Sequence, residues 1–473
     1  MITLTLTGGR GHKQTPPWPV PTWRFALKRP VLLASASALA LSTSLIGGFA
    51  PSASAVPRTP AGHASLLFGS GQDTVTIMAN QPALDSTVAQ IRTASAAAPS
   101  GSGLGGVSVD ALHNTVHLYW HGLIPARVSA IVTAARREHR TIAISKSPYT
   151  EAQLVKESQR IIASHPSNGV KVVSAGPDAD GTGLALGVAP AASSNRATAA
   201  VETAAVQSTL RSVTKYPFTV SAMTADQAQG WTGSSTMNRA VGGPGLYNMA
   251  GEHINMADGH ICSAGFAATY GGHDVVLTAA HCGWTTFTRN DGTTIGRTVQ
   301  SSTTYDIQAI SGTNSYSYGD VWLGPDYYDT SGNGQSAEEV SGVSGNSTGD
   351  WICTSGAETG YVCDIEVYAA GQTLSESNGV TYENLIFARD KSPNHAQIVA
   401  GGDSGGPVFF PQSNGTILAK GEIQAGLTQS GIGGQTNCTS TAAIDDGNPC
   451  YDLVAYEDIN LITSSIGATI KHF

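Results

Sequence analysis

The six cysteines of this chain all lie in its C-terminal half, and none precedes residue 262. They are Cys262, Cys282, Cys353, Cys363, Cys438 and Cys450. An even number of cysteines predicts disulfides, which persist in exported proteins, although spacing alone leaves their connectivity open. No C-x-x-C pair exists and the cysteines do not alternate with histidines at ligand spacing, so we expect no metal and no other cofactor. The cysteine-free stretch before residue 262 is therefore expected to form a separate domain.

The N-terminus has the features of an export signal. Arg24, Lys28 and Arg29 precede the uncharged run "VLLASASALALSTSLIGGFA", which is followed by an A-x-A site ending at Ala55. A basic segment, an apolar segment and a small-residue cleavage site predict a signal peptide at residues 1–55 and a secreted, extracellular protein. The alternative is a membrane anchor. Because the run is diluted with Ser, Thr and Gly, we expect no stable membrane anchoring.

Charge is distributed unevenly along the chain. From Asp226 to the C-terminus there are 25 acidic and 7 basic residues, whereas residues 56–225 hold 9 acidic and 13 basic ones. An acidic C-terminal half argues against nucleic-acid binding, which needs a basic surface. The opposite signs of the two parts favour their docking on each other.

The cysteine-free region has its own pattern of elements. Strand-like alternation at 107–120, helical spacing at 126–140 and 150–165, and further strands near 141–147, 171–176 and 183–189 give the order β-α-β-α-β-β. This order predicts a small α+β domain with a core at about 106–190. An Ala/Ser/Thr-rich linker is expected at about 190–215, and "YPFTV" is expected to be one further strand.

The segment "GGDSGGP" surrounds Ser404 with four glycines. Three interpretations fit it: a tight turn that leads into a strand, the G-x-S-x-G nucleophile elbow of α/β-hydrolases, or a loop whose backbone N–H groups bind an oxyanion. An elbow enzyme has its acid and its histidine after the serine in the chain. After Ser404 the only histidine is His472, the penultimate residue, so the order argues against the elbow.

A Ser-His-Asp triad fits the residues that precede the serine. His281 lies in "LTAAHC" beside Cys282, and Asp306 begins an apolar run. Imidazole can take the proton of a serine hydroxyl, and a carboxylate holds the ring in the useful tautomer. We predict His281, Asp306 and Ser404 as the catalytic residues, with the N–H groups of Gly402 and Ser404 as the oxyanion hole.

A second aspartate competes for the role of triad acid. Asp320, in "YGDVWLGP", also precedes an apolar stretch, but it lies 39 residues after His281. Asp306 lies 25 residues after it, and we favour Asp306.

The blocks "ICSAGFA", "VLTAAHC", "CTSGAETGYVC", "GGDSGGPV" and "GLTQSGIGGQTNC" resemble, in this order, those of the chymotrypsin-like (S1) serine peptidases. The resemblance is to the secreted bacterial branch of streptogrisins and α-lytic-protease-like enzymes, and it covers about 250–473. It implies an all-β peptidase domain at 226–473, with two six-stranded antiparallel barrels from about 250 and a C-terminal helix. Residues 106–190 are similar, more loosely, to the pro-regions of such enzymes, which implies a pro-region at 56–225 that assists folding and inhibits in cis.

The resemblance also implies disulfide pairs and shows departures. Cys262–Cys282 and Cys353–Cys363 would match family disulfides, and Cys438–Cys450 would replace a third. Relatives often have a cysteine where this chain has Ala400, and an arginine that pairs with the aspartate before the nucleophile where it has Thr354. The partner of Asp403 is therefore open, and Arg389 is one candidate. No "IVGG" terminus is present, so we expect inhibition by the pro-region instead of an ion-pair switch.

Two short segments are expected to bind substrate. One pocket wall comprises Ile398, Val399, Ala400 and Gly401, and the opposite edge comprises Thr428, Gln429, Ser430 and Gly431. In this family the residue six before the serine lies at the pocket base. Ile398 cannot pair with Arg or Lys, and Thr428 stands where glutamate-specific relatives have histidine, so we predict cleavage after apolar or aromatic residues. The edge is expected to pair with substrate backbone as an added strand.

The sequence thus predicts a secreted serine endopeptidase that is made as a pro-enzyme with a mature N-terminus between 226 and 250. Its expected partners are polypeptide substrates and its own pro-region, and we expect a monomer. Two alternatives remain: a non-catalytic binding protein on a protease scaffold, and esterase use of the same triad.

Overall fold

The computed structural model describes residues 68–164, 171–189, 206–226, 230–231, 247–289, 292–312, 316–324, 337–376, 380–392 and 396–472. All of these belong to one compact unit, Thr59–Phe473. The signal peptide expected at 1–55 lies outside the described residues, as does most of the segment expected to hold the mature N-terminus. Within the described part, no helix has both the length and the apolar character needed to span a membrane.

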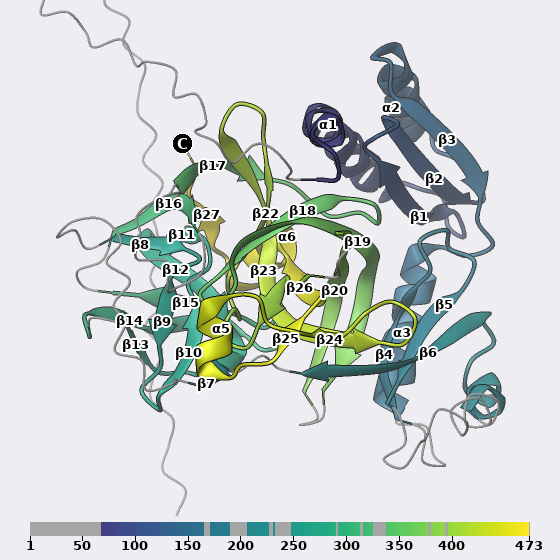
Figure 1. Cartoon of the computed structure of the whole chain (residues 1–473). Helices are drawn as coiled ribbons and strands as arrows, with labels where there is room; N and C mark the ends of the chain where they lie inside the picture. Colours follow the sequence, from purple (N-terminus) through teal and green to yellow (C-terminus); the bar gives the residue numbers. More distant parts are fainter. Residues whose placement is uncertain are drawn as a thin grey trace, which may run out of the picture. The chain divides into compact units, whose positions relative to one another are not determined.

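The N-terminal region, up to residue 226, combines helices with two groups of strands (Figure 1). Its named helices are α1 (Gly71–Ser95), α2 (Ala126–Arg137) and α3 (Glu151–Ser164). Its strands are β1 (Gly103–Asp110), β2 (Thr115–His121), β3 (Thr141–Lys146), β4 (Val172–Pro177), β5 (Leu184–Val188) and β6 (Phe218–Asp226). From β1 to β5 the elements follow the predicted order, except that the first expected strand is a hairpin of β1 and β2. Residues 206–213, in the stretch expected to be a linker, are helical.

Local sequence explains where α3 begins. The backbone N–H of Thr150 donates to Oε1 of Gln153 at 3.0 Å, and the backbone N–H of Gln153 donates to Oγ1 of Thr150 at 3.3 Å. This reciprocal capping box satisfies N–H groups that have no partner inside the helix. Leu154, Ile161 and Ile162 form its buried stripe, as the sequence predicts.

Helix α1 is not predicted from the sequence. It contains Pro82, and polar residues such as Gln81 and Asp85 interrupt its apolar pattern. Both of these polar side chains are buried, because they form hydrogen bonds with other parts of the chain. The buried stripe of α1 is therefore partly polar, and hydrophobic periodicity alone does not reveal it.

The first barrel carries the histidine and the aspartate of the expected triad. Its strands are β9 (His253–Asn255), β10 (His260–Ser263), β11 (Ala267–Tyr270), β12 (His273–Ala279), β13 (Thr286–Thr288), β14 (Thr294–Ser302) and β15 (Ile307–Ser311). Antiparallel pairing runs β11–β12–β15–β14–β13–β9–β10. Strands β10 and β11, which residues 264–266 connect, lie at the two ends of this series of seven strands.

The second barrel is a closed antiparallel ring. Its strands, in ring order, are β18 (Trp351–Gly356), β19 (Gly360–Ser375), β20 (Thr381–Asp390), β26 (Leu453–Asp458), β23 (Thr416–Gln429) and β22 (Pro407–Pro411). Each pairs with the next, and β22 pairs back with β18. These pairings agree with the six strands predicted for the second barrel, whereas the first barrel has a series of seven paired strands.

Shorter elements complete the C-terminal part. The strands are β7 (Gly230–Trp231), β8 (Tyr247–Ala250), β16 (Tyr316–Trp322), β17 (Ala337–Val343), β21 (Val399–Ala400), β24 (Gln435–Thr436), β25 (Cys450–Tyr451) and β27 (Thr469–Ile470). The helices are η1 (Ala280–Cys282), α5 (Thr441–Asp446) and α6 (Ile459–Ile466). Helix α6 is the expected C-terminal helix. It begins at Asp458, whose side chain accepts the backbone N–H of Asn460.

All six cysteines form disulfides: Cys262–Cys282, Cys353–Cys363 and Cys438–Cys450. These are the pairs that the family resemblance implies. The first joins β10 to η1 and so fixes the segment that carries His281 against the neighbouring strand.

Three strands of the N-terminal region extend the sheet of the second barrel. Strand β4 pairs with β19, β5 pairs with β4, and β6 lies between β5 and β23. The added strands therefore run from one barrel strand, β19, to another, β23. The opposite net charges of the two parts of the sequence fit this docking, but charge does not reveal which strands pair.

Candidate active site

The structure brings His281 and Asp306 into direct contact. Nδ1 of His281 is 2.6 Å from Oδ2 of Asp306, and the backbone N–H of His281 donates to Oδ1 of the same carboxylate at 2.8 Å. Both side chains are almost fully buried. The aspartate thus fixes both the ring and the backbone of the histidine, an arrangement that sets the tautomer with Nδ1 protonated.

The backbone at Asp306 is held in an uncommon conformation. Its φ angle is 42°, in the left-handed region that residues other than glycine seldom adopt. The carbonyl oxygen of Asp306 accepts the backbone N–H of Ala280 at 2.9 Å, so the same residue holds the segment before His281 as well. Asp320, the competing candidate, lies on β16 opposite Glu339 of β17. The geometry therefore favours Asp306.

Nε2 of His281 is buried and has no hydrogen-bond partner among the described residues. Burial alone lowers the pKa of this imidazole, but the charge of Asp306 and the hydrogen bond to it outweigh burial and raise the pKa above 6.5. A neutral ring with protonated Nδ1 leaves Nε2 as an acceptor, which is the atom that a general base needs.

Ser404 lies on the loop between β21 and β22, which crosses to the first barrel. The backbone N–H of Ser263 donates to the carbonyl oxygen of Ser404 at 2.8 Å, and Oγ of Ser263 donates to the carbonyl oxygen of Gly402 at 3.0 Å. Ser263 belongs to β10, beside Cys262. These bonds join the serine loop of one barrel to the disulfide-bonded segment that carries His281 on the other.

Two glycines in this loop are required by close contacts. Gly402 has a φ of 103°, and a Cβ there would lie 2.7 Å from Cγ of Glu358 and 2.9 Å from Cδ1 of Ile261. Gly405 has a φ of 81°, and its Cβ would lie 2.1 Å from Oγ1 of Thr278. Any side chain at either position would therefore displace the loop, which explains the glycines of "GGDSGGP".

Asp403 is buried without an arginine partner. Its carboxylate accepts the backbone N–H groups of Ala400, Glu358 and Thr359 at 2.7, 2.8 and 3.2 Å, and Oγ1 of Thr359 donates to it at 2.8 Å. Burial raises the pKa of Asp403 to about 6, although these four donors oppose the rise. The candidate Arg389 is wrong as its partner.

Arg389 lies elsewhere because its guanidinium pairs with Glu366 at 2.9 Å on the neighbouring strand. Thr359, between Cys353 and Cys363, donates the side-chain hydrogen bond to Asp403 in place of an arginine. A lone threonine in a polar segment gave no sequence signal for this role.

The expected pocket wall is buried and paired. Ile398 has no exposed surface, its N–H donates to the carbonyl oxygen of Tyr451, and its carbonyl oxygen accepts Oγ1 of Thr354. Val399 and Ala400 form β21, which pairs with β25, and the N–H of Gly401 donates to the carbonyl oxygen of Pro449. The side chain of Ile398 packs among apolar neighbours in one core cluster.

The opposite edge is paired with the N-terminal region. Thr428 and Gln429, at the end of β23, pair antiparallel with Thr224 and Met223 of β6. The N–H of Ser430 donates to the carbonyl oxygen of Ala222 at 2.9 Å, and Gly431 follows with a φ of 83°. Strand β6 thus lies where a substrate strand is expected.

A pair of buried glutamates lies between the barrels and was missed at the sequence level. Glu422 on β23 is the direct cross-strand neighbour of Glu457 on β26, and both have almost no exposed surface. One oxygen of Glu422 accepts the N–H of Phe266, in the first barrel, at 3.1 Å. Burial raises the pKa of both carboxyls well above 4.5, and the charge of Asp306 adds to the rise. Burial therefore favours the neutral acid form of both side chains.

One group of metal-ligating residue types occurs in the described part of the chain: Cys262, His281 and Cys282. The two sulfurs are bonded to each other. They have no thiolate to offer, so this group does not form a metal site.

The chain was compared with family models, curated proteins and solved structures. No family model and no curated protein matches the chain. Thermobifida fusca protease A has 22% sequence identity and a TM-score of 0.35, and the match covers 48% of this chain and 100% of that one. The Nocardiopsis protease has 24% identity, a TM-score of 0.34 and coverage of 48% and 99%. Cellulomonas bogoriensis chymotrypsin has 20% identity, a TM-score of 0.33 and coverage of 48% and 100%.

The chain is similar to bacterial proteases. At these identities and TM-scores the likeness does not assign an activity, which has to be argued from the residues of the site.

Proposed function

We propose that the chain is a secreted, chymotrypsin-like serine endopeptidase that is made as a pro-enzyme. The observation that carries this proposal is the contact between Asp306 and His281, with Nε2 of the histidine left as a buried acceptor. The serine loop of the second barrel is hydrogen-bonded to the strand that the disulfide joins to this histidine.

In the proposed mechanism the hydroxyl oxygen of Ser404 attacks the carbonyl carbon of the scissile peptide, while Nε2 of His281 takes the hydroxyl proton. The N–H groups of Gly402 and Ser404 bind the oxyanion of the tetrahedral intermediate. His281 then gives its proton to the leaving amine as the C–N bond breaks. A water molecule hydrolyses the acyl-enzyme by the same sequence, and the serine is regenerated.

The proposed preference is for an apolar or aromatic residue before the scissile bond. It rests on the uncharged, apolar Ile398 expected at the pocket base, which has no exposed surface in the structure and packs in an apolar core cluster. An apolar pocket favours apolar side chains through the hydrophobic effect and gives Arg or Lys no counter-charge. Polypeptides are the proposed substrates. No metal, other cofactor or nucleic acid takes part in the proposed reaction, which this chain performs as a monomer.

We assign the pro-region to residues 56–225. The pairing of β6 with the edge Thr428–Gly431 supports inhibition in cis, because a strand that occupies this edge excludes substrate backbone. Cleavage between 226 and 250 would leave the two barrels in one piece. Three disulfides in the barrel domain and the leader at 1–55 support secretion.

The test is to express the chain from residue 56 beside its Ser404→Ala variant, and to follow processing, peptide cleavage and labelling by a fluorophosphonate. The proposal expects processing and labelling in the wild type alone. A wild-type chain that neither matures nor becomes labelled would support the non-catalytic alternative. Cleavage of nitrophenyl esters without cleavage of any peptide would support the esterase alternative. A chromogenic panel in which Arg or Glu substrates outrun Phe or Leu would contradict the preference.

A further inference from the structure

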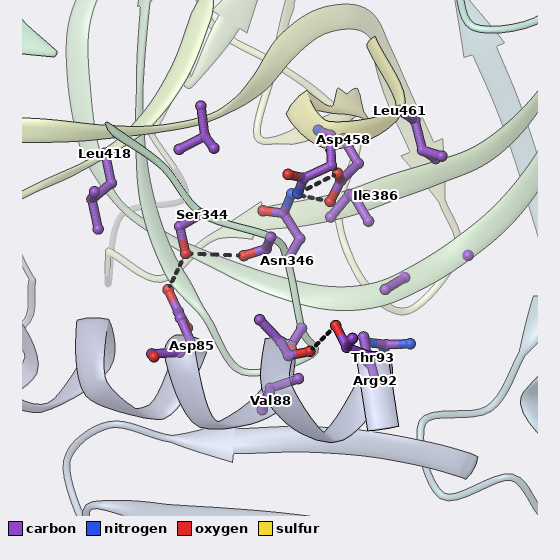
Figure 2. Close-up of a pocket in the computed structure, with 18 of the residues that line it drawn as sticks. Asp85, Val88, Arg92, Thr93, Ser344, Asn346, Ile386, Leu418, Asp458 and Leu461 are labelled. Atoms are coloured by element: carbon purple, nitrogen blue, oxygen red, sulfur yellow. Dashed lines mark hydrogen bonds between the residues drawn. The ribbon is translucent and has the colours of Figure 1, made fainter. Parts of the chain in front are cut away.

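A fully buried ion cluster joins α1 to the second barrel. Nζ of Lys420, on β23, lies 2.6 Å from Oδ2 of Asp85 in α1 and 2.9 Å from Oδ2 of Asp350 in the barrel domain. Oγ of Ser344 donates to the same Asp85 oxygen at 2.9 Å (Figure 2), and Nζ of Lys420 also donates to the carbonyl oxygen of Gly345. A buried ammonium needs such partners, and one of its two carboxylates comes from the N-terminal region.

Gln81 of α1 makes a second polar contact one turn earlier. Its side-chain amide donates to the carbonyl oxygen of Trp351, and its side-chain oxygen accepts the backbone N–H of the same residue, both at 2.8 Å. Trp351 is the first residue of β18, and β22 pairs with β18 only from Cys353 onward. The amide of Gln81 therefore takes the place of a strand partner at Trp351, where β22 does not pair with β18.

An aromatic contact lies just before the helix. The ring of Phe68 has no exposed surface and stacks on Phe410 of β22, with centroids 5.8 Å apart and planes 3° from parallel. Its centroid is also 5.8 Å from that of Trp351. Apolar burial and two specific polar contacts thus fall within residues 68–85.

The rest of α1 stands away from the barrel. A cavity of about 830 Å³ separates Val88, Arg92 and Thr93 of the helix from Ile386 and Leu418 of the barrel (Figure 2). The contacts described above therefore lie between Phe68 and Asp85, which is the fifteenth of the 25 residues of α1.

This contact is distant from the substrate edge. Lys420 precedes Gly426, where β6 begins to pair with β23, by six residues on the same strand. Six residues of extended strand span about 20 Å. Asp85 therefore does not touch the edge Thr428–Gly431, although α1 and β6 belong to the same N-terminal region.

We propose that Ser344, Asp350, Trp351, Phe410 and Lys420, here called the Lys420 face, form a docking site for α1 that is separate from the substrate site. It keeps the N-terminal region on the barrel domain after the chain between them has been cut. The inference rests on the proposed function, because it takes residues 56–225 as a pro-region. The region then acts as a bivalent inhibitor: α1 docked on the Lys420 face holds β6 at millimolar effective concentration beside the substrate edge.

The test uses the full chain with Ser404→Ala and a recognition sequence for a site-specific protease inserted between 232 and 246. After the cut, the dissociation rate of the N-terminal piece is measured by dilution and size-exclusion chromatography. Asp85→Lys faces Lys420 with a like charge, and we expect the piece to leave at least tenfold faster. Gln81→Ala removes both bonds to Trp351, and we expect dissociation several-fold faster. Both changes lie in the piece that leaves, so the barrel domain keeps its sequence.

The control is Gln90→Lys, which places a lysine at an exposed position of the same helix. Its dissociation rate is expected to stay within twofold of the parent. Equal rates for the parent, Asp85→Lys and Gln81→Ala would overturn the proposal. If Asp85→Lys prevents folding, Gln81→Ala alone decides. No catalysis is needed in this test, so failure of the endopeptidase proposal would appear in the labelling experiment and not here.

Discussion

Gln429 donates from its side-chain amide to Oγ of Ser221 at 3.0 Å, so the edge expected to hold substrate is bound by a residue of the N-terminal region. The side-chain oxygen of Gln429 accepts the hydroxyl of Tyr368 at 2.8 Å, which fixes the amide in this direction. Gln429, at the edge expected to bind substrate, therefore contacts the strand that covers this edge.

The first prediction concerns strand β6. Thr224→Pro removes one backbone N–H and restricts the backbone of a strand that pairs on both sides. We expect the N-terminal region carrying this change to inhibit the mature enzyme at least tenfold less strongly. The measurement is the constant for inhibition of the mature enzyme by the N-terminal region, after the chain between the two has been cleaved. Thr224→Val keeps the N–H and the strand conformation and is expected to inhibit as the wild type does. Equal inhibition by the proline variant would contradict the assignment of β6.

The second prediction concerns the triad acid. Asp306→Asn is expected to lower kcat by about 10⁴-fold, because the amide no longer sets the tautomer of His281 or stabilises the imidazolium. Asp320→Asn removes a carboxylate that faces Glu339 on a neighbouring strand, and its kcat is expected to change by less than about threefold. Peptide turnover by the two purified variants checks this. A large loss in the Asp320 variant with none in the Asp306 variant would reverse the assignment.

The third prediction is the pKa of His281. Asp306 raises it above 6.5 against the effect of burial, so the imidazole gains its proton at a higher pH than a free histidine. A titration of the full Ser404→Ala chain by NMR, with the signal assigned by a His281→Gln variant, should give a midpoint above 6.5. In Asp306→Asn the charge of Glu376 still raises the pKa, but the larger contribution of Asp306 is lost, so the midpoint should fall below that of the parent. An unchanged midpoint would mean that the contact does not control the base.

The parts of the site that could be predicted from the sequence are those where the chemistry requires small residues or fixed motifs. Glycines at 402 and 405 are demanded by the side-chain and backbone atoms that a Cβ would meet, and a histidine beside a cysteine is a local signal. The two barrels were predicted through the family resemblance, which rests on short sequence blocks that include these residues.

The parts that the sequence did not reveal depend on long-range pairing. Glu422 lies in "KGEIQAG", where alternating polar residues indicate a solvent-exposed strand face. In the structure Glu422 is buried and accepts a hydrogen bond from Phe266 of the first barrel, which the alternation does not indicate. The ion pair of Asp85 with Lys420 spans 335 residues, and no local pattern indicates it. Likewise, the donor to Asp403 is a threonine, a residue type too common to mark a role.

The fourth prediction tests the hydrogen bond that the side chain of Thr359 donates to Asp403. Thr359→Val removes the one side-chain donor to a buried carboxylate, which should lower the free energy of unfolding by about 1–3 kcal/mol. The turnover of the mature enzyme should fall as well, because the loop that carries Gly402 and Ser404 loses a fixed point. Arg389→Met is the control. Since Arg389 pairs with Glu366 instead, its kcat should stay close to the wild type. A loss of turnover in Arg389→Met, with none in Thr359→Val, would instead indicate Arg389 as the partner of Asp403.

The fifth prediction concerns the buried pair Glu422 and Glu457. Their folded-state pKa values are raised well above 4.5, so their contribution to stability is complete below about pH 4.5 and is lost as the pH rises through the raised values. Glutamine cannot ionise. In a Ser404→Ala chain, the free energy of unfolding of the Glu422→Gln/Glu457→Gln variant relative to its parent should therefore increase with pH, by up to about 1.4 kcal/mol per pH unit for each proton released.

Denaturant unfolding at pH 5, 7 and 9 measures this difference, with Glu366→Gln as the control. Glu366 is partly exposed and paired with Arg389, so its substitution should give no gain that grows toward alkaline pH. If the free energy of unfolding changes with pH in the same way for the parent and the double variant, both carboxyls ionise in the folded state as they do in the unfolded chain. In that case two negative charges would lie beside Asp306, and the midpoint of His281 in the third experiment would rise in the parent relative to the double variant.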